Sequence, residues 1–195
     1  MNKKICAWAA HTYPDYISYH NEEWGVPVHE DKTHFEFLTL EGAQAGLSWR
    51  TILNKRGGYR KAFADFNASL ISKFTATHLA SLMTNPNIVR NRLKIASVHE
   101  NAKAFIQIQE EFGSFDAYVW RFVDHRPIQG QWHAKQESPP SQTKISIQLS
   151  NALKKRGFKF VGSTIMYAYM QAVGMVNDHD FDCYRYQEIK ALTDS

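Results

Sequence analysis

Apolar residues recur at the spacing of one helical face along most of the chain. After Asp31, which is a plausible N-cap, Phe35, Leu38 and Ala45 follow about a turn or two apart. Gly174 is a typical C-terminal stop for the last of the further helices. These are predicted over residues 68–83, 88–111, 114–123, 141–155 and 162–173. Since no run of alternating apolar and polar residues indicates a strand, the pattern predicts an all-α protein.

A short helix is predicted directly after Gly46, in the stretch LSWRTIL (residues 47–53). Ser48 is a suitable N-cap for this helix. Leu47 and Ile52 then occupy the two positions of a hydrophobic staple, in which an apolar residue before the cap packs against one in the first turn.

The one long turn-rich segment runs from His125 to Thr143. It retains Ile128 and Trp132 as apolar anchors, so it is interpreted as a connection between helices and not as a domain boundary. We therefore expect residues 1–195 to form a single unit, or two closely packed helical lobes with a pocket between them.

Composition places the chain among globular proteins, with 44% hydrophobic and 22% charged residues. A net charge of +4 and a sequence pI near 9.0 favour an acidic partner, with nucleic acid as the first candidate. No apolar run approaches the roughly 20 residues that span a bilayer, and the start of the chain lacks the apolar core of a signal peptide. We therefore expect a cytoplasmic protein with no membrane partner.

Two cysteines, Cys6 and Cys183, lie at opposite ends of the chain, each with a histidine near it. His20 follows Cys6, and His179 precedes Cys183 by four positions. Two thiolates and two imidazoles are the ligand set of a closed tetrahedral zinc site, which would tie the ends of the chain together. The alternatives are two unrelated buried thiols or a disulfide, and a disulfide is disfavoured without an export signal.

One carboxylate, Glu41, stands among small residues in the stretch LEGAQAGLSW (residues 40–49). Its small neighbours would let a ligand approach it closely, whereas the alternative is a helix-surface acid paired with Arg50 or Lys55. Aromatic residues are concentrated near the start of the chain, where they form either a packed core or the walls of a pocket for a base or a cation. They are Trp8, Tyr13, Tyr16, Tyr19 and Trp24.

A basic cluster follows an Asn-Pro-Asn turn at residues 85–87. A helix that starts near Ile88 would carry Arg90, Arg92 and Lys94 in its first turns. Because a helix N-terminus offers free N–H groups and the positive end of the helix dipole, this helix could bind a phosphate. The alternative is a basic, solvent-exposed helix face.

Several segments resemble, in order and over nearly the full length, the DNA-3-methyladenine glycosylase I family, the constitutive bacterial 3-methyladenine glycosylases. The segments are YHNEEWGVP, LEGAQAGLSWRTIL, NIVRNRLKI and LKKRGFKFVGSTIMYAYMQAVGMVNDH, with the terminal His179 and Cys183. The resemblance implies an all-α helix-hairpin-helix fold with a terminal zinc staple. It also implies a monofunctional hydrolase that removes N3-methyladenine from DNA in base excision repair.

The resemblance also implies roles for individual residues. One structural zinc is expected on Cys6, His20, His179 and Cys183. Glu41 is the expected catalytic residue and reads the base, in a pocket walled by Trp8, Tyr16, Tyr19, Trp24 and Trp49. The expected DNA contacts are Gly46, Leu47, Asn87, Ile88 and Arg90, with Leu47 filling the gap left by the extruded nucleotide.

Asn87 departs from the family pattern, because such hairpins often carry glycine at this place. Asparagine tolerates a left-handed backbone better than most residues, so we expect it to preserve the hairpin. The expected partners are double-stranded DNA containing 3-methyladenine and free 3-methyladenine as the product, with the chain acting as a monomeric catalytic unit.

Two other classes of protein fit the same residues. A DNA-binding module that recognises alkylated or bent DNA would have the same hairpin and basic patches but would release no base. A small-molecule enzyme that uses the aromatic pocket would show no DNA affinity that falls with salt.

Overall fold

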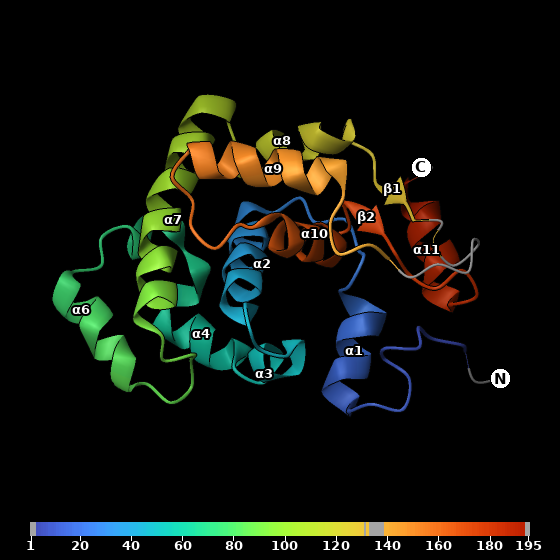
Figure 1. Cartoon of the computed structure of the whole chain (residues 1–195), viewed down its shortest axis with the longest axis horizontal. Coiled ribbons are helices and arrows are strands. Elements are labelled where there is room, and N and C mark those ends of the chain that lie inside the picture. Colours follow the sequence, from blue (N-terminus) through green and yellow to red (C-terminus); the bar gives the residue numbers. More distant parts are fainter. Residues whose placement is uncertain (1–2, 131, 133–138, 194–195) are drawn as a thin grey trace.

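The computed structural model describes residues 3–130, 132 and 139–193 (Figure 1). Nearly all of the regular structure in these residues is helical, as predicted. Its one sheet is a parallel pair of two-residue strands, β1 (Ile128–Gln129) and β2 (Val176–Asn177). The prediction that no strand forms is therefore wrong for this pair, because two residues a strand are too few to leave an alternating pattern.

Two helices form the centre of the molecule, α2 (Asp31–Gln44) and α10 (Ser163–Ala172). They are covered by α7 (Arg92–Phe112), α8 (Phe115–Trp120), the 3-10 helix η3 (Arg121–Val123) and α9 (Lys144–Lys155) (Figure 1). Phe105 packs against Phe35 and Phe115, with ring centroids 5.1 and 4.2 Å apart. This aromatic core fixes α2, and with it the residues near the C-terminal end of α2.

A second group of short helices packs around α7 and the end of α2, since α5, α6 and η2 contact α7, α3 contacts α2, and α4 contacts η1 (Figure 1). It comprises α3 (Trp49–Leu53), α4 (Arg56–Ala62), η1 (Ala64–Phe66), α5 (Ala68–Ile71), α6 (Ala76–Ser81) and η2 (Leu82–Thr84). The single helix predicted over residues 68–83 is wrong. Thr75 interrupts it, because its side chain accepts a hydrogen bond from the His78 N–H and so caps a new helix.

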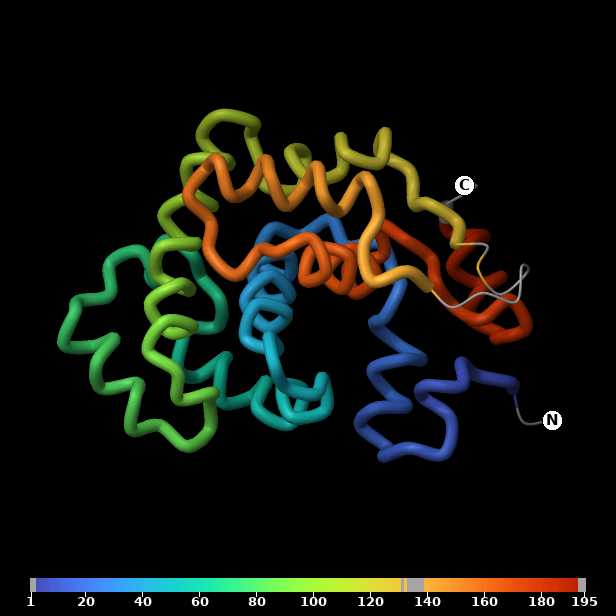
Figure 2. Tube along the Cα trace, viewed as in Figure 1, coloured from blue at the N-terminus to red at the C-terminus, as the bar shows by residue number. Residues whose placement is uncertain are grey.

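The two ends of the chain lie on the same side of the molecule (Figure 2). They carry α1 (Pro14–Glu22) and α11 (Tyr184–Thr193), and the Tyr184 N–H donates to the Lys4 carbonyl. Arg56 joins the first of these segments to the helical core, since it donates to Glu23 and Glu36 at 2.7–2.8 Å.

Two predicted helix starts are wrong, and each has an identifiable cause. The long helix begins at Arg92 and not at Ile88, because the Asn91 side chain accepts from the Leu93 and Lys94 N–H groups. Asp31 does not cap its own helix. Its carboxylate accepts from the Phe115 and Asp116 N–H groups instead, so it caps α8.

Other sequence predictions are confirmed. Ser48 caps α3 through the Thr51 N–H. Gly174 follows α10 with φ +71°, and a Cβ atom there would lie 2.3 Å from the Val26 carbonyl carbon, so only glycine fits. Trp132 anchors its connection by donating to Asp178, although part of that connection lies outside the described residues. None of the described helices combines the length and apolar character needed to cross a bilayer.

Candidate functional site

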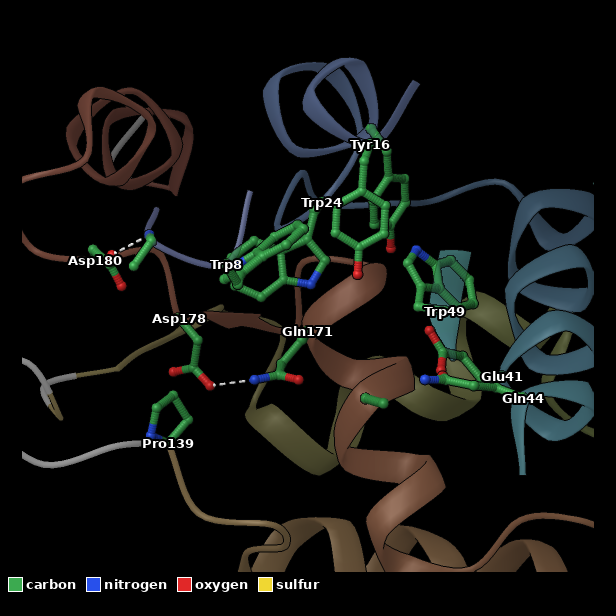
Figure 3. A pocket seen from close by; sticks show the side chains of 13 residues that line it. Trp8, Tyr16, Trp24, Glu41, Gln44, Trp49, Pro139, Gln171, Asp178 and Asp180 are labelled. Carbon is green, nitrogen blue, oxygen red and sulfur yellow. Dashed lines mark hydrogen bonds between the residues drawn. The ribbon is translucent and has the colours of Figure 1, made fainter. Parts of the chain in front are cut away.

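A cavity of about 400 Å³ opens between α1, α2, α3 and α10 (Figure 3). We call it the aromatic pocket. It brings together all six residues predicted to bind a base, which are Trp8, Tyr16, Tyr19, Trp24, Glu41 and Trp49. The other lining residues are Ala7, Gln44, Pro139, Ala168, Gln171, Asp178 and Asp180. The predicted pocket residues thus converge from three helices, α1, α2 and α3, and from the segments that flank α1.

Glu41 lies near the C-terminal end of α2 and is 4% exposed. No group in the described part of the chain donates a hydrogen bond or forms an ion pair to its carboxyl group. Burial raises its pKa to about 8, because the ionised form loses its hydration. The alternative of a surface acid paired with Arg50 or Lys55 is wrong, since Arg50 stacks on the Tyr13 ring and Lys55 donates to the Pro86 carbonyl.

The walls of the aromatic pocket are rings in mutual contact. Tyr19 and Trp49 lie with their centroids 5.3 Å apart, and Trp8 meets Tyr16 and Trp24 edge to face at 5.3 and 5.0 Å. The Trp49 indole N–H is buried, and within residues 3–130, 132 and 139–193 it has no hydrogen-bond partner. The pocket therefore offers flat apolar walls, one unpaired donor and one unpaired acid, which suits a planar ligand with polar edges.

None of the seven other lining residues was predicted from the sequence, and Gln171 and Asp178 are the two of them whose polar groups are joined by a hydrogen bond. Asp178 accepts hydrogen bonds from Tyr167, Trp132 and the Gln171 amide nitrogen at 2.5, 3.0 and 2.8 Å. Because an ionised carboxylate only accepts, this contact fixes the Gln171 amide and leaves its carbonyl oxygen free on the pocket side (Figure 3). The only sequence signal is the three-residue spacing that places Gln171 on the same face of α10 as Ala168.

Four metal-ligating side chains also meet, and we call them the Cys/His centre. The ligand atoms of Cys6, His20, His179 and Cys183 all lie within 4.8 Å of one another, and all four residues are buried. Both thiols are free, so the disulfide and the unrelated thiols considered from the sequence are both wrong. The group could therefore hold a metal ion.

The histidine rings of the Cys/His centre are already oriented toward the sulfur atoms. His179 Nδ1 lies 3.4 Å from Cys6 Sγ, and its Nε2 lies 2.9 Å from the Trp24 carbonyl oxygen. His20 Nε2 lies 3.6 Å from Cys183 Sγ, and its Nδ1 lies 2.8 Å from Asn21 Oδ1. Such outer hydrogen bonds are the usual support of metal-ligating histidines, so the donor set fits zinc.

Hydrogen bonds and two tryptophan rings surround the Cys/His centre. The hydrogen bond from the Cys6 thiol, with those from the two histidines, lowers the pKa of Cys183. Trp24 and Trp8 lie between the centre and the aromatic pocket, since their rings contact His179 and His20 at 4.7 and 5.3 Å. The Cys/His centre thus supports one wall of the pocket.

The loop after α2 carries two of the expected DNA contacts. Gly46 is exposed with φ +77°, and Leu47 is 41% exposed although it is apolar. Lys94 holds this loop from behind, because its ammonium group donates to the Ala43 and Ala45 carbonyls at 2.8 and 2.6 Å. Lys94 is therefore buried at the end of α2 and does not belong to an exposed basic face.

The predicted hairpin, residues 85–90, lies in the loop of residues 85–91 between η2 and α7. The Asn87 N–H donates to Asn85 Oδ1, which confirms the tight turn. Asn87 has no positive φ, so the turn does not use the left-handed backbone that asparagine tolerates. The glycine that this loop requires is Gly58 on α4, where a Cβ atom would lie 2.2 Å from the Asn87 carbonyl oxygen. Ile88 is buried, whereas Asn87 and Arg90 are exposed.

Comparison with known proteins identifies similar sequences and structures. A family model described as methyladenine glycosylase matches residues 8–186. The chain is 45% identical to "DNA-3-methyladenine glycosylase 1" of Escherichia coli over 178 residues, which are 91% of this chain and 94% of that protein. A crystal structure of a 3-methyladenine DNA glycosylase I matches with a TM-score of 0.88 at 43% identity, covering 93% of this chain and 98% of the other.

A structure from Staphylococcus aureus is also similar, and its subject is 3-methyladenine recognition by 3-methyladenine DNA glycosylase I. It matches with a TM-score of 0.87 at 36% identity, and the alignment covers 92% of this chain and 94% of the other.

Proposed function

The chain belongs to the methyladenine glycosylase family, and from this premise we propose that Glu41 and the aromatic pocket read N3-methyladenine while its bond to deoxyribose is hydrolysed. The enzyme is a DNA glycosylase of base excision repair. The observation that carries the proposed role of Glu41 is its buried carboxyl group, which has no partner among the described residues and faces a cavity walled by aromatic rings. A cationic purine supplies the missing partner.

The chemistry needs little help from the protein beyond recognition. Methylation at N3 makes the base cationic in the nucleotide, so the electron pair of the C1′–N9 bond passes readily to the base and neutralises it. Water adds at C1′ and releases a proton. Because extrusion from the helix costs least for a damaged base, the enzyme mainly has to capture that base and hold it.

Each wall of the aromatic pocket has a proposed part in this capture. Aromatic faces attract the cationic ring of the base. Glu41 accepts hydrogen bonds from the amino edge of the base, and a cation beside it favours the ionised carboxylate. Burial raises the pKa of the Tyr19 hydroxyl well above its ordinary value, so Tyr19 remains a neutral donor beside the base.

The Cys/His centre is proposed to hold one structural zinc ion. Four protein ligands would fill the tetrahedral positions and leave none for water, so the ion would stabilise the joined ends of the chain. The ligands come from residues before and within α1 and from the segment between β2 and α11. The zinc would thereby keep Trp8 and Trp24 in place as walls of the aromatic pocket.

Contacts to double-stranded DNA are proposed for two loops, the one between α2 and α3 and the one between η2 and α7. Leu47, with Gly46 beside it, would fill the gap that the extruded nucleotide leaves in the duplex. Loop 85–91 would act as the hairpin, with Asn87 and Arg90 exposed toward the backbone and Ile88 contributing only its main chain, since its side chain is buried.

We further propose that residues 1–195 form one catalytic unit and act as a monomer in the cytoplasm. The central helices and the shorter helices beside α7 would be two closely packed lobes of this unit. Double-stranded DNA containing 3-methyladenine would be its substrate, and free 3-methyladenine its product.

Base release from methylated DNA tests the proposed function. The protein is incubated with duplex DNA treated with a methylating agent, and the supernatant is separated by chromatography. We expect free 3-methyladenine to appear much faster than it does without protein, and no adenine to be released from untreated duplex. Binding to methylated duplex with only the spontaneous rate of release would identify a DNA-binding module instead.

A further inference from the structure

The aromatic pocket has an exposed rim made by one stacked pair, Tyr13 and Arg50. The Arg50 guanidinium lies over the Tyr13 ring, 3.0 Å from its centroid. Tyr13 precedes α1, whose Tyr16 lines the pocket, and Arg50 follows Trp49, which lines it from α3. Both residues of the pair are exposed, and the exposed fraction of Tyr13 is 50%. Neither residue lines the pocket itself, but the pair joins α1 and α3, which each supply one of its walls.

Arg50 has no anionic partner in the described residues, in contrast to Arg56 and Arg156. Arg56 is bound by Glu23 and Glu36, and Arg156 by Glu111. Stacking covers a face of the Arg50 guanidinium and orients the group, while the N–H donors on its edges make no hydrogen bond within residues 3–130, 132 and 139–193. A planar, oriented cation with unused donors is suited to an oxyanion such as a phosphodiester.

The position of the pair indicates that this oxyanion is a phosphodiester of a bound nucleic acid. Leu47, 41% exposed, is separated from Arg50 only by Ser48 and Trp49, so the proposed plug, the pocket residue Trp49 and the cation follow one another at the start of α3. A nucleotide extruded into the pocket must carry its flanking phosphates past this rim. The geometry points to Arg50 as a clamp for a phosphate beside the extruded nucleotide, with Tyr13 as the residue that positions it.

This inference rests on the proposed function and adds a DNA contact to it. The alternative is a purely structural role, in which the Tyr13–Arg50 contact only holds α1 against α3. The two differ in what they do to salt dependence, because each protein cation that neutralises a phosphate releases a counterion. A pair that only joins two helices leaves that dependence unchanged.

The test is the salt dependence of binding to an unmodified duplex and to a duplex with a stable abasic-site analogue. Arg50→Met keeps the length of the side chain and removes its charge. We expect the slope of log Kd against log salt concentration to fall in magnitude by about 0.9, with affinity for the abasic duplex about tenfold weaker at low salt. Tyr13→Ala should give a smaller loss in the same direction, and Tyr13→Phe, which keeps the stack, should behave as the parent.

Lys154→Met is the matched control, because Lys154 is an exposed cation on α9, at the opposite edge of the molecule from α3 (Figure 1). It should retain the parental slope. Affinity for free 3-methyladenine should be parental in Arg50→Met, since the clamp does not touch the base.

A parental salt slope in Arg50→Met, or an equal loss of free-base and duplex binding, overturns the clamp. Neither result would contradict the proposed glycosylase activity, because that activity is measured separately by base release. Conversely, absence of base release would refute the proposed function while the salt slopes could still show a phosphate contact at Arg50.

Discussion

The Cys/His centre and the aromatic pocket share Trp8 and Trp24 but treat their polar groups in opposite ways. In the centre, four ligand atoms face one another, and the outer nitrogen of each histidine has its own partner. In the pocket, the Glu41 carboxyl and the Trp49 indole N–H are buried without a partner among the described residues. The centre is a set of groups that needs only a metal ion, whereas the pocket needs a molecule with donors and acceptors of its own.

This difference shows which of the two regions stabilises the protein and which one acts on a ligand. An unpaired polar group in a protein interior costs about 1–3 kcal/mol, so a ligand that pairs with the groups of the pocket recovers that cost. The pocket keeps such groups at its aromatic walls. The centre joins residues more than 150 positions apart in the sequence, so its failure should affect the whole fold.

Metal removal should give the largest effect and affect stability first. We expect about one zinc per purified chain by elemental analysis. Treatment with a strong chelator should lower the free energy of unfolding by about 4 kcal/mol or more, which corresponds to roughly 10 °C in Tm for a chain of this size. Cys183→Ser should behave like the chelated protein, and His11→Ala, which changes a histidine outside the centre, should not. Metal-free protein with a Cys6–Cys183 disulfide and unchanged Tm would contradict a zinc centre.

Glu41→Gln should reduce activity without reducing stability. The amide keeps the shape of the acid but lacks its charge, so the contact to a cationic base loses about 1.5–3 kcal/mol. Single-turnover excision of 3-methyladenine should therefore fall by about one to two powers of ten. Tm and salt-matched affinity for undamaged duplex should not fall, because phosphate contacts set that affinity.

Glu110→Gln is the control for this variant, since Glu110 is an exposed acid on α7. It should excise at the parental rate. If Glu41→Gln also excises at the parental rate, the acid does not read the base. If excision, duplex affinity and Tm all fall together, the role of Glu41 is structural.

The sequence alone predicts the Cys/His centre better than it predicts the aromatic pocket. The ligands of the Cys/His centre are identifiable from residue type, because few side chains bind soft metals and both cysteines of the chain take part. Glu41 has no such signature. Small neighbours suggested an accessible acid, but its choice over a surface ion pair came from the family resemblance.

Long-range hydrogen bonds account for what the sequence did not predict. Asp31 has the right place and type for a cap, yet it caps α8 and not α2. Lys94 fits a phosphate-binding helix start, yet the two carbonyls behind the Gly46 loop take its donors. Gln171 and Asp178 enter the pocket through a contact between α10 and the end of β2. Local periodicity carries no information about such partners.

The pH dependence of stability sharpens the comparison, because burial of Glu41 in the pocket makes the folded state hold a proton on its carboxyl group. The carboxyl group titrates near 4.5 when unfolded and at about 8 in the folded protein. Between these values the folded state holds a proton that the unfolded state has released. The free energy of unfolding should therefore fall as pH rises through this range, by up to about 1.4 kcal/mol per pH unit.

Glu41→Gln lacks this titration, so the stability difference between the two proteins isolates it. Unfolding by urea at pH 5, 6, 7 and 8 should show the parent losing stability relative to the variant at each step. All other titrating groups are common to both proteins and cancel. Parallel pH profiles would show that the Glu41 carboxyl finds a partner or water in solution and is not desolvated.

Leu47→Ala should have the smallest effect on stability and separates the plug from the hydrophobic staple. A Leu47 that mainly packs against the first turn of α3 should cost stability when truncated, as its staple partner does. Ile52 is fully buried, so Ile52→Ala should lower the free energy of unfolding by about 2–5 kcal/mol. Leu47 is 41% exposed, so Leu47→Ala should stay within about 0.5 kcal/mol of the parent. Excision from duplex should nevertheless fall several-fold, because nothing then occupies the gap in the base stack, while affinity for free 3-methyladenine stays parental. An equal loss in the duplex and free-base assays, together with a lower Tm, would assign Leu47 to the staple and leave the gap in the duplex to be filled by another side chain.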